Sequence, residues 1–159
     1  MVVQKEDLDR FLAVLERLRR DSNAKYAFLL DRSGQQIVSV GTIENNDPTS
    51  LASLAAGTVA ATEGLAQVIG EGAFSTIYHE GERDSVHISV VADKVILLVV
   101  FDLKSSVGLV RLRVKQCEGE LGAVVEGMLE RSRSGPAGAG VAAAGLDDIS
   151  DEDIDALFG

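Results

Sequence analysis

Apolar side chains recur every three or four positions over residues 6–20, with charged side chains between them. This period is typical of an amphipathic helix that buries one face. The apolar positions of this expected first helix are Leu8, Phe11, Leu12, Leu15 and Leu18.

Five short apolar segments separated by turn residues predict β-strands. Short turns link them into hairpins, which favours a mostly antiparallel sheet. In the fourth segment, valine and isoleucine alternate with His87 and Ser89, indicating one favoured apolar face. The fifth is apolar throughout and predicts a central strand with helices over both faces. The expected strands are 26–30, 36–40, 74–79, 85–91 and 95–102.

Asp47 and Pro48 predict the start of a second helix, because Asp suits the N-cap and Pro the first helical position. We expect it to end near Ile69, before Gly70. A third helix is expected over residues 107–130, giving the element order α-β-β-α-β-β-β-α and an α+β fold. Its expected buried positions are Leu109, Leu112, Leu121, Val124, Val125 and Met128.

The second helix carries apolar residues on one side and small residues on the other. We expect the first side to pack on the sheet through Leu51, Leu54, Thr58, Ala61, Leu65 and Ile69. The other side holds Ala52, Ser53, Ala56, Gly57, Ala60, Glu63, Gly64 and Gln67. An exposed helix side is normally charged, so this one predicts a contact surface for a second copy or a partner protein. The alternative is a helix buried on both sides within one domain.

Negative charge is concentrated near the C-terminal end of the 159 residues, whose net charge is −10. Residues 132–159 hold one basic and six acidic side chains, which is half of that excess. We expect a domain over residues 1–131, a flexible linker over 132–146 and an acidic peptide over 147–159. Such an acidic chain is a poor candidate for binding nucleic acid or an anionic membrane. One cysteine, no signal peptide and no long apolar run predict a soluble cytoplasmic protein.

The acidic peptide has its own pattern. Ser150 followed by Asp153 is typical of a helix start. The apolar residues after it would lie on one face of a short helix, which predicts a segment that binds a partner. Its candidate docking residues are Ile149, Ile154, Leu157 and Phe158. The alternatives are a solubilising tail, or a peptide for phosphorylated response regulators, because the segment resembles one in flagellar switch proteins.

No motif for intrinsic catalysis is present. Glycine-rich phosphate-binding patterns are absent, and the two histidines and one cysteine do not form a zinc pattern. We expect His79 and His87 on the strand surface and Cys117 in the core. Arg111, Arg113 and Lys115 are expected to be a solvated basic face. We expect no catalytic residue, cofactor or metal.

The sequences of residues 49–71, 107–115 and 149–158 resemble those of the Roadblock (dynein light-chain-like) family, and more narrowly those of its bacterial MglB type. The resemblance covers nearly the whole chain apart from the linker. It implies a sheet of order 2-1-5-4-3 with helices on both faces. It also implies a homodimer with a continuous sheet, joined through the third strand at Phe74, Thr76, Ile77 and Tyr78.

The resemblance further implies binding to a Ras-like GTPase of the MglA type through the paired second helices. The expected function is GTPase activation without a catalytic site in this chain, in the control of cell polarity and motility from a cell pole. The alternative is a non-catalytic polar scaffold or localisation adaptor. The interface residues are expected to be Ala52, Ala56, Gly57, Ala60, Glu63, Gly64 and Gln67.

Overall fold

A computed structural model describes residues 2–42, 47–74 and 76–134. The element order within these residues is the expected α-β-β-α-β-β-β-α. The helices are α1 (Lys5–Asp21), α2 (Pro48–Val68) and α3 (Val107–Ser134). The strands are β1 (Tyr26–Asp31), β2 (Gln36–Gly41), β3 (Thr76–Glu80), β4 (Ser85–Val91) and β5 (Val95–Phe101).

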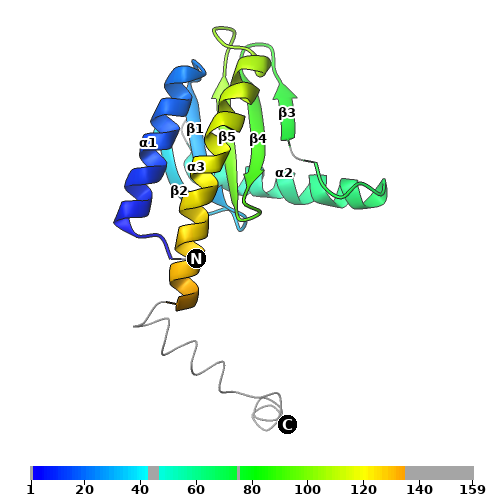
Figure 1. Cartoon of the computed structure of the whole chain (residues 1–159). Coiled ribbons are helices and arrows are strands. Elements are labelled where there is room, and N and C mark those ends of the chain that lie inside the picture. The colour runs from blue at the N-terminus through cyan, green and yellow to red at the C-terminus, as the bar shows by residue number, and fades with distance from the viewer. Residues whose placement is uncertain (1, 43–46, 75, 135–159) are drawn as a thin grey trace.

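The strands form one antiparallel sheet of order β2-β1-β5-β4-β3, as the sequence and its family resemblance predicted (Figure 1). β5 lies at the centre and is buried along its whole length, which confirms its prediction as a strand covered on both faces. β2 and β3 form the two edges. The backbone groups on the outer side of each edge strand are therefore available for pairing with another strand.

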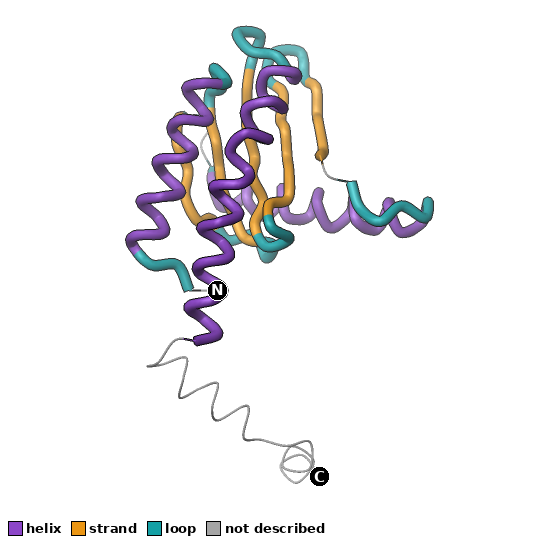
Figure 2. The backbone as a smooth tube through the Cα atoms, in the orientation of Figure 1, coloured by secondary structure: helices purple, strands orange, loops and turns teal. Residues whose placement is uncertain are grey.

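Two apolar layers flank the sheet. α1 and α3 pack together on one face, around a cluster that includes Phe11, Leu97 and Leu121. On the other face α2 packs alone, against a smaller cluster that includes Phe28 and Leu98. Figure 2 shows the end of α2 and the loop that follows it projecting past β3. The face under α2 is thus less completely covered than the face under α1 and α3.

Local sequence signals explain the limits of α2. The Asp47 carboxylate accepts a hydrogen bond from the Ser50 backbone N–H at 3.1 Å, and Pro48 occupies the first turn. Gly70 follows the helix with a φ of +78°, a conformation that glycine adopts without strain. Both predicted ends of the helix are therefore confirmed to within a residue.

Several expectations from the sequence need correction. β3 begins at Thr76, so Phe74 precedes the strand. α3 continues four residues past its expected end at residue 130. Leu112, expected in the core, is 51% exposed, because it lies on the side of α3 that faces away from the sheet. The acidic peptide, including Ile149, Ile154, Leu157 and Phe158, lies outside the described residues, and none of the described helices is long and apolar enough to span a membrane.

Candidate functional site

The exposed side of α2 combines small and large apolar side chains and is nearly uncharged. Glu63 is the single ionisable residue in this 21-residue helix. Leu54, Leu65 and Val68 are large apolar side chains with exposed fractions of 70%, 58% and 84%. We call this side the outer face of α2; it comprises Ser53, Leu54, Gly57, Ala60, Ala61, Gly64, Leu65, Gln67 and Val68.

The predicted packing side of α2 is wrong for most of its residues, although Leu51 packs against the core under the helix as expected. Leu54 and Leu65, expected against the sheet, are exposed, and Ile69 is 61% exposed just beyond the helix. The residues that are buried instead are Ala52, Ala55, Val59 and Ala66. Three of these four are alanines, so the side of α2 that faces the sheet buries mainly small side chains. The larger leucines are left on the side where no other element of the described chain covers them.

The expected interface residues divide into two groups. Gly57, Ala60, Gly64 and Gln67 lie exposed on the outer face of α2, where the sequence placed them. Ala52 is 1% exposed and faces the sheet, so its expected place on an accessible surface is wrong. Two further residues are half-buried: Ala56 packs against the core below α2, and Glu63 forms an ion pair with Arg32.

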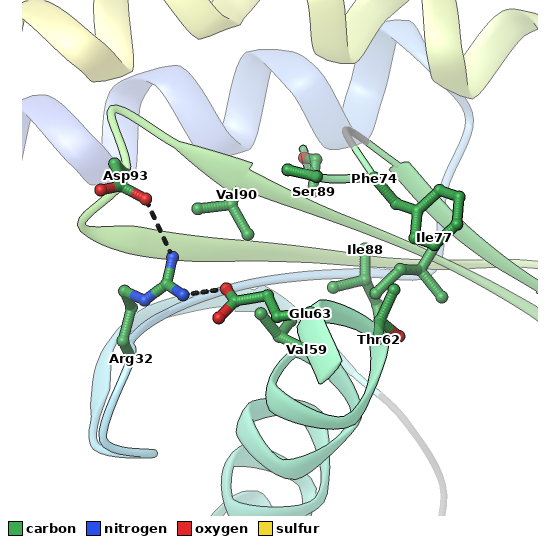
Figure 3. A pocket seen from close by; sticks show the side chains of 11 residues that line it. Arg32, Val59, Thr62, Glu63, Phe74, Ile77, Ile88, Ser89, Val90 and Asp93 are labelled. Atoms are coloured by element: carbon green, nitrogen blue, oxygen red, sulfur yellow. Dashed lines mark hydrogen bonds and ion pairs between the residues drawn. The ribbon is translucent and has the colours of Figure 1, made fainter. Parts of the chain in front are cut away.

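A small hollow separates α2 from the edge of the sheet (Figure 3). It measures about 70 Å³, and its apolar lining includes Val59, Phe74, Ile77, Ile88 and Val90. Phe74 is 39% exposed. Ile77 of β3 and Val90 of β4 thus remain partly exposed beside the outer face of α2. β3 is the edge strand through which the family resemblance implies dimer contact.

A bridge of ion pairs closes one end of this hollow. The Arg32 guanidinium, from the turn between β1 and β2, pairs with Glu63 of α2 (Figure 3). Its other nitrogen lies 3.3 Å from an Asp93 carboxylate oxygen in the turn between β4 and β5. Arg32 therefore fixes α2 against two turns of the sheet, and its charge is balanced within the protein.

The two histidines do not form a site together. Tyr78 pairs with His87 across β3 and β4, so the neighbouring His79 points to the opposite face of the sheet. His79 is exposed as expected, but His87 is buried under α3, which corrects its prediction as a surface residue. The described residues contain no cluster of acidic, histidine or cysteine side chains suited to a metal ion.

Cys117 is buried in the core, which confirms its prediction as a small apolar residue. Desolvation is the largest cause that raises the pKa of its thiol to about 12. Because the thiolate is the reactive form, Cys117 is poorly suited to be a nucleophile.

Comparison with known proteins identifies the family. The Roadblock/LC7 domain matches residues 10–101. MglB of Myxococcus xanthus is 47% identical, with a TM-score of 0.74 and coverage of 80% of this chain and 96% of that one. The gliding protein MglB of Thermus thermophilus is 31% identical, with a TM-score of 0.72 and coverage of 79% and 96%.

A structure titled MglB with tetrameric arrangement is also 31% identical, with a TM-score of 0.74 and coverage of 79% and 95%. A comparison with curated protein sequences finds no significant match. The family match covers more than half of the chain, and the MglB structures are matched over almost their whole lengths. The chain therefore belongs to the Roadblock/LC7 domain family.

Proposed function

We propose that this protein regulates a Ras-like GTPase of the MglA type, and that it accelerates GTP hydrolysis by binding the GTPase on the outer face of α2. Two lines of support meet here. The chain is similar to MglB proteins over most of its length. The observation that carries the proposal is the outer face itself, where Gly57, Ala60 and Gly64 leave a flat surface without charge.

Such a surface is unusual for a helix exposed to water, because its outward positions are normally charged. Gly57 and Gly64 each cost about 1 kcal/mol relative to alanine in a helix interior. An ideal Cβ at either position would meet nothing within 4 Å in the described chain. The core of this protein therefore does not require glycine there, whereas close approach of a partner's backbone does.

The proposed active form is a homodimer. β3 is an edge strand, and its pairing with a second copy would continue the sheet. The same association would bring the two α2 helices together and cover Leu54, Leu65 and Val68 on one side of the outer face. Gly57, Ala60 and Gly64, on the other side of that face, would remain for the GTPase. The hollow beside Phe74 lies along this edge and offers apolar contact to the second copy.

The mechanism within this proposal is selection of a competent GTPase conformation. GTP hydrolysis requires an oriented water, Mg²⁺ and stabilisation of charge on the transferring phosphoryl group. An activator can supply an arginine or can favour the arrangement in which the GTPase's own groups are aligned. α2 contains no arginine, and Arg32 is paired with Glu63 and Asp93. Arg83, exposed on the β3–β4 hairpin, is the residue to test for the first mechanism.

The proposal is tested by single-turnover GTP hydrolysis on an MglA-type GTPase from the same cell. We expect saturable stimulation by this protein and its loss in Ala60→Arg, because a long cation cannot fit a flat contact. Gly119→Arg is the matched control, because Gly119 is exposed on α3, across the sheet from α2. Full stimulation by Ala60→Arg would contradict the proposed surface.

Binding without stimulation would instead identify a scaffold that anchors the GTPase. This second candidate is favoured by the lack of any arginine on α2. In either role we propose that the protein acts at a cell pole, which fluorescence microscopy of the tagged full chain would test.

A further inference from the structure

A groove runs between α1 and α3, on the sheet face opposite α2. It consists of two adjoining hollows of about 160 and 260 Å³. Its lining comes from both helices. The apolar part of this lining consists of Ala13 and Ala123, which are exposed, and of the buried residues Val14, Leu18, Cys117 and Val124. Ala13 and Ala123 are not fully buried, so no described element covers the groove.

Three arginines border this groove, together with the carboxylates of Asp21 and Glu120. Arg17 forms an ion pair across it with Glu120. Arg10 is exposed and makes no hydrogen bond or ion pair with any of the described residues. Arg113 donates from Nη1 to the Gln116 side chain at 3.0 Å, while its buried Nε lacks a partner in the described part of the chain. The Arg10 guanidinium and Nη2 of Arg113, for which the described residues supply no hydrogen-bond partner, therefore keep donors for carboxylates.

The last described residues belong to α3, one of the two helices that line this groove. Arg131, near the end of α3, pairs with Asp7 and donates to the Gln4 side chain at 2.8 Å, which ties that end to the start of α1. Figure 1 shows the two helices running side by side. Twenty-five residues, 135–159, follow the last described residue, Ser134.

The segment that follows Ser134 is long enough to bring the acidic peptide to the groove. Eleven helical residues separate Ser134 from Ala123, a distance of about 16 Å at 1.5 Å per residue. Residues 135–146 can extend to about 40 Å. The acidic peptide 147–159 can therefore reach the whole groove from its own chain. Tethering of this kind gives a local concentration on the order of millimolar, so a weak contact is sufficient for docking.

We propose that the acidic peptide, residues 147–159, docks into the groove between α1 and α3 of its own chain. The peptide holds six carboxylates and no basic residue, which complements Arg10 and Arg113. Its apolar residues Ile154, Leu157 and Phe158 match the alanine- and valine-lined base of the groove. Surface ion pairs alone contribute little, so the apolar contacts hold the peptide and the arginines set its orientation.

Docking in the groove would control whether the acidic peptide can bind another partner. When the peptide occupies the groove, its apolar residues are hidden from every other partner. The outer face of α2 lies across the sheet and stays accessible. This inference does not depend on the proposed GTPase, and it holds equally for a scaffold.

Paramagnetic relaxation in the full chain tests the docking. A nitroxide attached to Gly159→Cys labels the peptide, while the buried Cys117, with its raised thiol pKa, is left unreacted. We expect strong broadening of the Val14 and Val124 methyl signals. Val59 and Ile88, buried on the α2 side of the sheet, are the internal controls. Broadening of the groove methyls no greater than that of these controls would overturn the proposal.

Charge variants provide the second arm. The double variant Arg10→Glu, Arg113→Glu should lose at least tenfold of the paramagnetic enhancement, because it replaces two attractive contacts with repulsion of the peptide's six carboxylates. About 0.5 M salt should weaken the enhancement in the wild type. Arg83→Glu is the matched control, because Arg83 lies exposed on the β3–β4 hairpin. Enhancement that survives the double variant would contradict the assigned groove.

A mixing experiment separates a chain's own peptide from that of a second copy. Spin-labelled chain without isotopes is mixed with isotope-labelled chain that carries no spin label. We expect no broadening at Val14 and Val124 in this mixture. Broadening there would show that the groove takes the peptide of another copy and would overturn docking within one chain.

Discussion

At the scale of single residues, His87 is the clearest departure from the sequence pattern. It is 1% exposed, and neither of its ring nitrogens has a hydrogen-bond partner among the described residues. The neighbouring Ser89 hydroxyl, on the same face of β4, is also buried without a described partner. Desolvation, with a smaller contribution from the positive charge of Arg111, lowers the pKa of His87 to about 4. His87 is therefore neutral in the folded protein at neutral pH.

This shift predicts a loss of stability in mild acid. The folded-state pKa of His87 lies below the unfolded value of 6.5, so the unfolded chain binds more protons between pH 6.5 and pH 4. From pH 7.5 to 5.0 the wild type should lose about 2 kcal/mol more unfolding free energy than His87→Leu, which has no imidazole. Urea denaturation at both pH values measures this difference. Equal losses of unfolding free energy in the two proteins would show that His87 does not cause the acid destabilisation.

At the scale of elements, periodicity and turn residues were sufficient to predict every helix and strand of the described chain. β4 matches its expected bounds, and the N-cap at Asp47 set the start of α2. The faces of the elements were harder to predict. The outward Leu54 and the inward Ala52 follow from how α2 is rotated about its own axis against the sheet. The burial of His87 follows from where α3 crosses β4. The local sequence pattern predicts neither of these two packing arrangements.

Part of the candidate site was therefore predictable and part was not. Gly57, Ala60 and Gly64 stood out because small residues lacked charged neighbours on one side of a helix. Arg32 was missed, because its contact with Glu63 joins residues 31 positions apart and needs the fold to bring them together. A basic residue in a turn gives no local signal of such a contact.

The pairing of α1 with α3 leads to a second prediction. Asp7 is 3% exposed, and its carboxylate accepts from the Gln4 backbone N–H at 2.9 Å and pairs with Arg131. Arg131→Ala would leave this carboxylate buried without its cation. Since Arg131 itself is partly exposed, we expect the free energy of unfolding to fall by about 2 kcal/mol, which is below the range for fully buried pairs.

Arg17→Ala is the matched control for that variant. It also removes an arginine that pairs across α1 and α3 and is about as exposed as Arg131, but its partner Glu120 is 54% exposed, whereas the Asp7 side chain is 5% exposed. Its expected cost is below about 1 kcal/mol. Urea denaturation of the two variants and of the wild type measures both costs as differences in unfolding free energy. Equal costs would mean that burial of Asp7 adds nothing to its ion pair.

At the scale of the whole molecule, the two faces of the sheet are covered unequally. α1 and α3 bury even the polar side chains of β4 on one face, namely Ser85, His87 and Ser89. On the other face the apolar Val86 and Val90 remain partly exposed, although they belong to the core cluster under α2. A single copy thus leaves apolar surface uncovered beside an unpaired edge strand. The proposed homodimer accounts for both features with one contact.

That contact gives the last prediction, which concerns Leu65 and Val68 on the outer face of α2. The double variant Leu65→Asp, Val68→Asp should weaken self-association by more than about a hundredfold. At a two-fold interface both copies carry the substitutions, so each lost apolar contact occurs twice. Its fold should be retained, since both side chains are exposed in the single chain. Sedimentation velocity measures the mass. Leu103→Asp, Leu112→Asp is the control, with exposed leucines outside α2 and β3. A dimer that survives the first variant and dissociates in the second would place the contact at α3 instead of α2.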